Sequence, residues 1–177
     1  MGANLAVAFG RRQVAFSLVP IAPHIRRLRE KVGHDLLVLP SVAVIPRDDE
    51  GRVLLVRVSD TGQWAVIGGA IEPDESPEAS ALREAEEEAG VQLRLGALLA
   101  VLGGPEYRIT YPNGDDTSYV STVFDARVIG GSPTPDGDET LDVEWWAPSE
   151  LPYAEMSSFT HALLGAVGLG PSKDDLP

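Results

Sequence analysis

Short apolar runs, several of them alternating with polar residues, recur along this chain. They are rich in β-branched residues, and turns containing Gly, Pro, Asn or Asp separate them, such as the Asn113-Gly114 pair. Such runs are typical of strands that bury one face or both. The predicted strands are residues 36–45, 52–58, 91–101, 107–111, 118–129 and 141–146.

Three other segments have helical spacing. Residues 24–32 carry an apolar stripe surrounded by basic side chains, which predicts a helix that packs on the domain or on a partner subunit in a homodimer. This helix could instead supply a cationic edge to a substrate site. Residues 76–90 form the central helix, and residues 156–167 form a late one. Strands on either side of one central helix predict an α/β (α+β) sandwich.

The central helix has clear ends. Ser76 is a good N-cap, and Pro77 suits the first helical position because its missing N–H has no partner there. Gly90 can supply the left-handed residue that ends the helix. We expect the apolar side of this helix to face a core. That side is predicted to carry Leu82, Ala85 and Ala89.

The opposite side of this helix is acidic. Glu84, Glu87 and Glu88 share one face at spacings i, i+3 and i+4. Like charges at this spacing destabilise an isolated helix by roughly 0.2–0.5 kcal/mol per pair. Glu86 lies on another side and is expected to be solvated. A hard divalent cation would turn the repulsion into a binding site. The alternative is an ordinary solvated acidic face.

The spacing around these acids resembles the Nudix box of the Nudix hydrolases. That box is Gly, five residues, Glu, seven residues, then Arg-Glu-aliphatic-x-Glu-Glu-x-Gly-aliphatic. Ala85 is smaller than the usual aliphatic residue, and Ile67 stands where many members have a proline. Trp64 resembles the Trp that often precedes the box. The matching positions are Gly69, Glu75, Arg83, Glu84, Ala85, Glu87, Glu88, Gly90 and Val91.

The resemblance implies a Nudix-type α/β/α sandwich around a mixed sheet. It would occupy residues 24–168, including the leading helix. Residues 1–23 would be an N-terminal extension, in which residues 13–19 form a short strand or a loose segment. Residues 169–177 would be a disordered tail.

The resemblance also implies roles for the matching residues. Glu84, Glu87 and Glu88 look like ligands of Mg²⁺, with Mn²⁺ as a possible substitute, and the backbone carbonyl of Gly68 looks like a further ligand. Arg83 and Glu75 look like residues that hold these ligands. Nudix enzymes often add an acid from a later loop as base or ligand. Glu139 is our candidate for that acid, with Asp136 and Asp138 as alternatives.

Other residues of chemical interest carry weaker signals. The three histidines show no ligand spacing and are expected to be structural or exposed. Five aromatic residues could stack on a nucleobase, although packing in the core or on the sheet is the simpler interpretation. These residues are His24, His34, His161, Tyr107, Tyr111, Tyr119, Trp145 and Trp146.

Composition limits the classes of function. The chain has 177 residues, enough for one domain, and a net charge of −13, which argues against a broad nucleic-acid surface. It has no cysteine, which excludes disulfides, thiolate nucleophiles and Cys-ligated zinc. No window is long and apolar enough for a membrane span, and basic residues follow the N-terminal apolar patch instead of preceding it. We expect a cytoplasmic protein.

The resemblance implies a pyrophosphohydrolase that cleaves a nucleoside diphosphate linked to a group X. Markers after the box conflict, because Pro105 resembles, one position off, the proline of ADP-ribose pyrophosphatases, whereas Tyr107 resembles the tyrosine of dinucleoside polyphosphate hydrolases. ADP-ribose or a nucleotide sugar is our first expectation. A (d)NTP, including an oxidised one, is the alternative. A rival from another class is a Nudix domain that only senses a nucleotide.

Overall fold

The computed structural model describes residues 22–170. The interpretations of residues 13–19 as a strand or loose segment, and of residues 171–177 as part of a disordered tail, fall outside this range.

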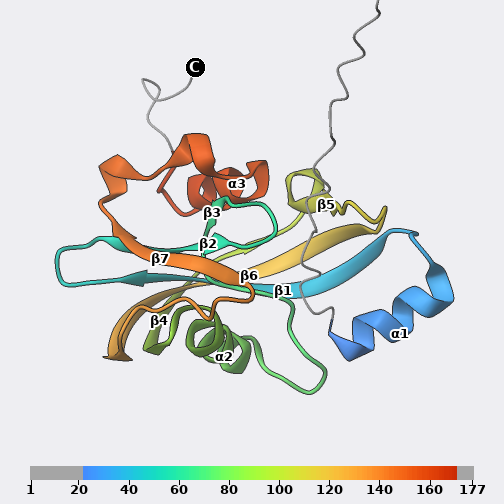
Figure 1. The fold of residues 1–177 in the computed structure, drawn as a ribbon, viewed down its shortest axis with the longest axis horizontal. Coiled ribbons are helices and arrows are strands. Elements are labelled where there is room, and N and C mark those ends of the chain that lie inside the picture. The colour runs from blue at the N-terminus through green and yellow to red at the C-terminus, as the bar shows by residue number, and fades with distance from the viewer. Residues whose placement is uncertain (1–21, 171–177) are drawn as a thin grey trace, which may run out of the picture.

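A mixed seven-stranded sheet forms the centre of the molecule (Figure 1). Its path is β3-β2-β1-β6-β4, with β5 paired to β6 and β7 paired to β2. β1 and β6 run parallel, and the other pairs are antiparallel. The strands are β1 Leu37–Arg47, β2 Val53–Val58, β3 Trp64–Ala65, β4 Val91–Leu102, β5 Arg108–Thr110, β6 Asp116–Gly131 and β7 Thr140–Trp146.

Helices lie on both sides of this sheet. α2 (Pro77–Ala89) packs on one face, and α3 (Ser158–Ala166) packs on the other, so the predicted α/β/α sandwich around a mixed sheet is confirmed (Figure 1). α1 (Pro23–Val32) precedes β1, and three short 3-10 turns lie at Pro105–Tyr107, Pro148–Glu150 and Tyr153–Glu155. Among residues 22–170, no helix has the length and hydropathy needed to cross a membrane.

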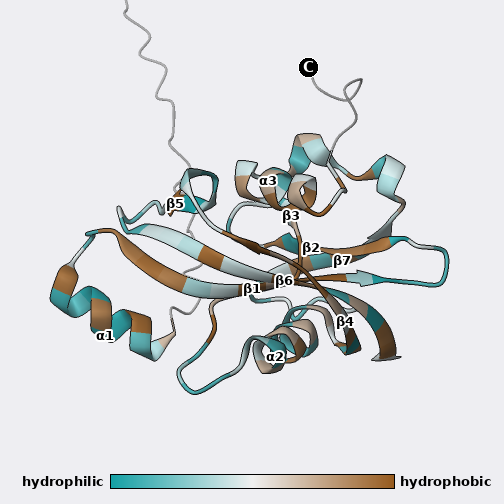
Figure 2. Cartoon of the chain, turned by 180° about the vertical axis from the view of Figure 1, so that it is seen from behind, coloured by the Kyte–Doolittle hydropathy of each residue, from teal (hydrophilic) through white to brown (hydrophobic). Residues whose placement is uncertain are grey.

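The sheet separates two cores. One core lies between the sheet and α2 and includes Val42, Val44 and Phe124. The other lies between the sheet and α3 and includes Ile45, Val123 and Leu163. Because side chains alternate along a strand, the β1 and β6 residues of the two cores follow each other in sequence. Apolar residues accordingly run along both strands in Figure 2.

The apolar side of α2 differs from the prediction. Ala81, Ala85 and Ala89 are fully buried against the sheet, whereas Leu82 is 41% exposed. Each residue turns a helix by about 100°, so turning Glu84 toward its loop also turns the alanine row onto the sheet. Leu82 is thereby left at the edge, and the small alanine side chains let the helix approach the strands closely.

A fork in the sheet places the loop after β3 beside β1. β1 and β2 pair only at Arg47 and Val53, and the two strands then separate. Beyond this point, residues 67–69 pair with the edge of β1 that β2 has left. Val44 N donates to the Ile67 carbonyl at 2.9 Å, and Val42 N donates to the Gly69 carbonyl at 2.9 Å. The glycine loop therefore lies at the fork, next to α2.

Candidate active site

Two glycines let this loop approach its neighbours closely. A Cβ on Gly68 would lie 2.2 Å from the Val42 carbonyl oxygen, and the residue has a φ of +155°. A Cβ on Gly69 would lie 2.4 Å from Glu84 Oε1. Both distances are far below a van der Waals contact, so only glycine fits here without movement. The carboxylate of Glu84 consequently packs directly against the loop backbone.

The helix that carries the acids is fixed at both ends. Ser76 Oγ accepts from the Ala79 amide at 3.2 Å, and Gly90 ends the helix in the left-handed conformation, as predicted. The last carbonyls also find partners outside the helix. Thr140 Oγ1 donates to the Glu88 carbonyl at 2.7 Å, which ties the start of β7 to the end of α2.

Arg83 joins three of the acids. Its guanidinium holds Glu75 through two hydrogen bonds of 2.9 Å, from Nε and Nη2. Its Nη1 donates to Glu84 Oε1 and to Glu87 Oε2, also at 2.9 Å each. The hydrogen bond to Glu75 is the main reason that the pKa of Arg83 is raised, and it lowers the pKa of Glu75. Arg83 thus orients carboxylates that belong to the helix and to the loop before it.

Glu84 and Glu88 lie against the glycine loop. Glu84 is only 7% exposed, and burial raises its pKa despite the nearby charge of Arg83. Glu88 Oε2 accepts from the Gly68 amide at 3.1 Å. Burial, and then the negative charge of Glu84, raise the pKa of Glu88 well above its ordinary value. The positive charge of Arg83 therefore does not balance the negative charges of the acids at the glycine loop.

Glu87 is placed differently from the other two. Its side chain is 60% exposed and turns toward Arg83. Glu84 and Glu87 accept hydrogen bonds from the same guanidinium nitrogen of Arg83, so their carboxylates lie close together. Glu88 does not share this contact. Within residues 22–170, no group of three or more His, Asp or Glu side chains has the arrangement of a preformed metal site.

Glu139 reaches the same cluster from the loop before β7. Asp136 Oδ1 accepts from the amides of Glu139 and Thr140 at 3.1 and 2.8 Å, which fixes the end of this loop. Burial, and then the charge of Asp136, raise the pKa of Glu139. The negative charge of Glu139 also raises the pKa of Glu84 and Glu88. Asp136 therefore supports the loop, and Glu139 adds its charge to the cluster.

Sequence reasoning missed the turn after β2 as part of this region. Ser59 N donates to the Glu139 carbonyl at 2.9 Å. The hydroxyl of Ser59 and one carboxylate oxygen of Asp60 are buried and have no hydrogen-bond partner in the described residues. Asp60-Thr61-Gly62 has the composition of an ordinary turn, and nothing in the local sequence distinguishes it from one.

His34, His161 and most of the aromatic residues have structural partners. His34 Nδ1 lies 2.7 Å from Asp115 Oδ1, and His161 Nε2 lies 2.6 Å from the Tyr153 carbonyl. Tyr107 and Tyr119 both pack edge-on against Phe159, on the α3 side of the sheet. Trp146 packs edge-on against Trp64, Trp145 borders the α2 core, and the hydroxyls of Tyr111 and Tyr119 lie 2.6 Å apart.

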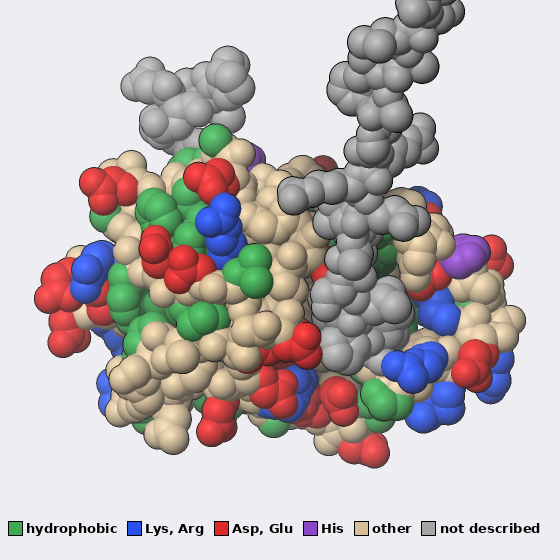
Figure 3. All heavy atoms as spheres, viewed as in Figure 1, with side chains coloured by type: hydrophobic (Ala, Val, Ile, Leu, Met, Phe, Trp, Pro, Cys, Tyr) green, Lys and Arg blue, Asp and Glu red, His purple; other side chains and the backbone are tan. Residues whose placement is uncertain are grey.

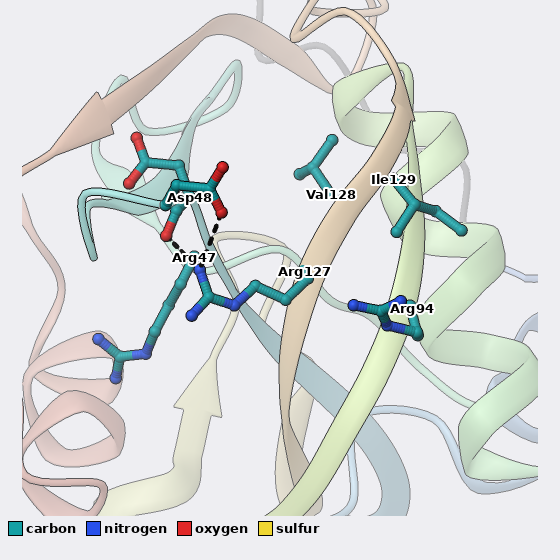
Figure 4. Close-up of a pocket in the computed structure, with 7 residues that line it drawn as sticks. Arg47, Asp48, Arg94, Arg127, Val128 and Ile129 are labelled. Atoms are coloured by element: carbon teal, nitrogen blue, oxygen red, sulfur yellow. Dashed lines mark hydrogen bonds and ion pairs between the residues drawn. The ribbon is translucent and has the colours of Figure 1, made fainter.

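A pocket bordered by β1, β4 and β6 contains none of the box residues. Arg47, Arg94 and Arg127 line it from three neighbouring strands, together with Asp48 (Figure 4). Figure 4 shows the three guanidinium groups pointing apart, with Arg127 directed toward Asp48. This arrangement does not converge on one ligand.

Known proteins share both the sequence pattern and the fold. The model of the NUDIX domain matches residues 37–164. A MutT-like protein of Streptomyces ambofaciens is 32% identical over 132 residues, which make up 74% of this chain and 79% of that protein. Nucleoside triphosphatase NudI of Salmonella agona (strain SL483) is 31% identical over 129 residues, or 68% of this chain and 91% of that protein.

A solved structure agrees with these sequence relatives. The MutT NUDIX hydrolase from Burkholderia pseudomallei superposes with a TM-score of 0.60 at 28% identity, covering 75% of this chain and 98% of that one. The family model spans the sheet, the glycine loop and the acidic helix together. This chain therefore belongs to the Nudix hydrolase family and is a hydrolase of phosphorus anhydrides.

Proposed function

We propose that this protein hydrolyses a nucleoside triphosphate to the monophosphate and pyrophosphate with the help of Mg²⁺. A nucleoside triphosphate is a nucleoside diphosphate linked to a further phosphate. It therefore belongs to the substrate class expected from the sequence, with phosphate as the group X. The preference for a triphosphate rests on a relative of 31% identity that is named a nucleoside triphosphatase. ADP-ribose and nucleotide sugars, the first expectation from the sequence, are the competing substrates.

The observation that carries this proposal is the crowding of carboxylates at the glycine loop. Burial raises the pKa of Glu84, Glu88 and Glu139, and the negative charge of Glu139 raises the pKa of the two helix acids further. Arg83 contacts this cluster through Glu84. All available donors are oxygens, which suits a hard divalent cation. Nudix hydrolases generally need divalent metal ions. The residues present fit such an ion, provided that Glu87 exchanges its contact with Arg83 for the ion.

Each residue then has a proposed role. Glu84, Glu87 and Glu88 would hold the metal, together with the backbone carbonyl of Gly68. The metal, when bound, neutralises phosphate charge and lowers the pKa of water. Arg83 and Glu75 would hold the carboxylates in position, because the guanidinium already bonds to the helix and to the loop.

Glu139 is the proposed general base. Burial and neighbouring acids raise its pKa, and a base is more effective when its pKa is closer to the working pH. Its backbone is held by Ser59 and Asp136, while its side chain is half-buried. Glu139 can therefore accept a proton at a constant position beside Glu84 and Glu88.

Glu139→Gln is expected to lower kcat by a factor of about 10²–10⁴ and to leave metal affinity nearly unchanged. The amide keeps the shape of the side chain and cannot accept the proton. Turnover and the Mg²⁺ concentration for half-maximal activity check this result, with Glu86→Gln, at an exposed acid of α2, as the control. If both quantities change, Glu139 is a ligand. If neither changes at any pH, the role of base moves to Glu84.

The proposed function is tested by a nucleotide panel in the presence of Mg²⁺. We expect a nucleoside triphosphate to give the highest kcat/KM and to yield monophosphate and pyrophosphate. Higher kcat/KM for ADP-ribose or a nucleotide sugar, with AMP or another monophosphate as product, would reverse the choice of X. Tight binding of a nucleotide without turnover would support the sensor instead.

A further inference from the structure

The segment that carries Glu139 closes the end of α2. The last carbonyls of a helix have no partner within the helix. Here the Ala89 carbonyl accepts from Thr134 N at 2.9 Å, and the Glu88 carbonyl accepts from Thr140 Oγ1 at 2.7 Å. Glu139 lies between these two points of attachment, so the end of the helix holds its segment from both sides.

An irregularity in β7 turns Thr140 toward α2. Thr140 and Asp142 pair with two successive residues of β2, so Leu141 between them is one residue too many. Val143 borders the core between the sheet and α2. Simple alternation from Val143 would place Leu141 on the side of α2 and Thr140 on the other side. Instead, Leu141 is 54% exposed, whereas Thr140 is 1% exposed and bonds to the helix.

Thr140 also belongs to the turn that precedes Glu139. Asp136 N donates to Thr140 Oγ1 at 3.2 Å, and Asp136 Oδ1 accepts from Thr140 N at 2.8 Å. Gly137 N donates to the Thr140 carbonyl at 3.0 Å. The hydroxyl has one proton, and the Glu88 carbonyl is the nearer of its two acceptors, at 2.7 Å against 3.0 Å to Asp136 Oδ1. One buried hydroxyl thus joins α2 to this turn.

Repulsion between acids makes such a link necessary. Figure 3 shows acidic side chains gathered on the surface around α2. The negative charge of Glu139 also raises the pKa of Glu84 and Glu88, so the three carboxylates repel one another when they are ionised. A segment that carries a further acid would move away from α2 unless a contact of its own held it there.

We propose that Thr140 is a positioning residue for the hydrolysis, because its hydroxyl holds Glu139 at a fixed place beside the acids of α2. Glu88 presents its side chain to the glycine loop and its carbonyl to Thr140. Ser59 N, which donates to the Glu139 carbonyl at 2.9 Å, holds the same segment from β2. A base must keep a constant distance from the groups that orient the water, and small displacements lower the rate. The inference rests on the proposed function, in which Glu139 is the base.

Thr140→Val removes the hydroxyl and keeps the shape of the side chain. We expect kcat to fall about ten- to a hundredfold, while KM for the nucleoside triphosphate and the Mg²⁺ concentration for half-maximal activity change by less than about threefold. Thr140→Ser keeps the hydroxyl and should retain kcat within about threefold of wild type. Thr117→Val is the matched control, because Thr117 is 2% exposed and its hydroxyl bonds to Arg29 of α1. Its kcat should match wild type.

Melting curves on the same samples separate loss of the fold from loss of position, and kcat is measured well below the transition. If Thr140→Val does not fold, Asp136→Ala tests the other end of the link. It removes the acceptor of the Glu139 and Thr140 amides and leaves the bond from Thr140 Oγ1 to Glu88 in place. We expect the same fall in kcat, and a wild-type kcat in Asp136→Ala would overturn the inference.

A double-mutant cycle tests whether Thr140 acts through Glu139. In a Glu139→Gln background, Thr140→Val should lower kcat by less than about twofold further, because the base it positions is already lost. The full loss in both backgrounds would overturn the inference, as would a wild-type kcat in Thr140→Val or an equal loss in Thr140→Ser. A raised Mg²⁺ requirement with unchanged kcat would also overturn it, since Thr140 would then support only Glu88.

The cycle also separates this inference from the proposed function. If Glu139→Gln lowers kcat and Thr140→Val does not, the inference alone fails. If Glu139→Gln is without effect, the assignment of the base is wrong and the inference fails with it.

Discussion

Removal of divalent cations is expected to abolish turnover, with a loss of at least about a thousandfold in rate. The chain has a net charge of −13, and the acidic cluster of Glu84, Glu88 and Glu139 repels a substrate that is itself an anion. Arg83 is the cation that contacts this cluster, and its guanidinium is already shared among three carboxylates. The protein alone therefore lacks the charge needed to bind a polyphosphate and stabilise its transition state.

The experiment is a chelator titration followed by addition of Mg²⁺ or Mn²⁺, with the nucleotide panel as the assay. Activity should disappear with the chelator and return with either ion. The fold should persist throughout, because the two cores do not depend on the cluster, and circular dichroism provides that control. Full turnover in metal-free buffer would contradict the mechanism.

Glu88→Gln is expected to have the second large effect, a fall in kcat on the order of a hundred- to a thousandfold. Glu88 lies against the Gly68 amide at 3.1 Å, where a carboxamide oxygen can still accept that hydrogen bond. The substitution therefore keeps the shape and the hydrogen bond while removing the charge. Glu87→Gln should also lower the rate, because Glu87 shares Arg83 with Glu84.

The same substitution is expected to stabilise the metal-free protein. The pKa of Glu88 is raised by burial, so the folded protein binds this proton more tightly than the unfolded chain does. Stability is therefore lost as pH rises from the ordinary carboxyl pKa of 4.5 to the raised value. Glu88→Gln removes this loss, and a gain of about 1–2 kcal/mol above the raised pKa would lift the Tm by roughly 2–8 °C.

Melting curves with a chelator across pH, beside the kinetics, check both expectations. Glu86→Gln is the matched control, since Glu86 is an exposed acid on the same helix and should leave the rate and the Tm nearly unchanged. Normal turnover in Glu88→Gln, with a correct melting transition, would show that catalysis does not need the charge of Glu88. A Tm that falls in metal-free buffer would show that its charge is compensated in the fold.

Local sequence determined the elements and the chemistry of the box. Ser76 and Gly90 predicted the ends of α2 because capping depends on residues within one turn of the helix. The strand patterns predicted all the long strands, since alternation between two cores is visible in each strand alone. The spacing of Glu84, Glu87 and Glu88 followed from the period of the helix. Family membership rested on the same residues.

Only the tertiary structure decided how these residues meet. Helical spacing allowed either Leu82 or Ala81 to face the sheet, and the requirement that Glu84 reach the glycine loop selected Ala81. The approach of Glu139 and Ser59 to each other depends on the pairing of β7 with β2, and the place of the glycine loop depends on the fork between β1 and β2. Sequence periodicity contains neither. The burial of each acid and the charges around it depend on segments that lie far apart in the sequence. Only packing around the sheet brings those segments together.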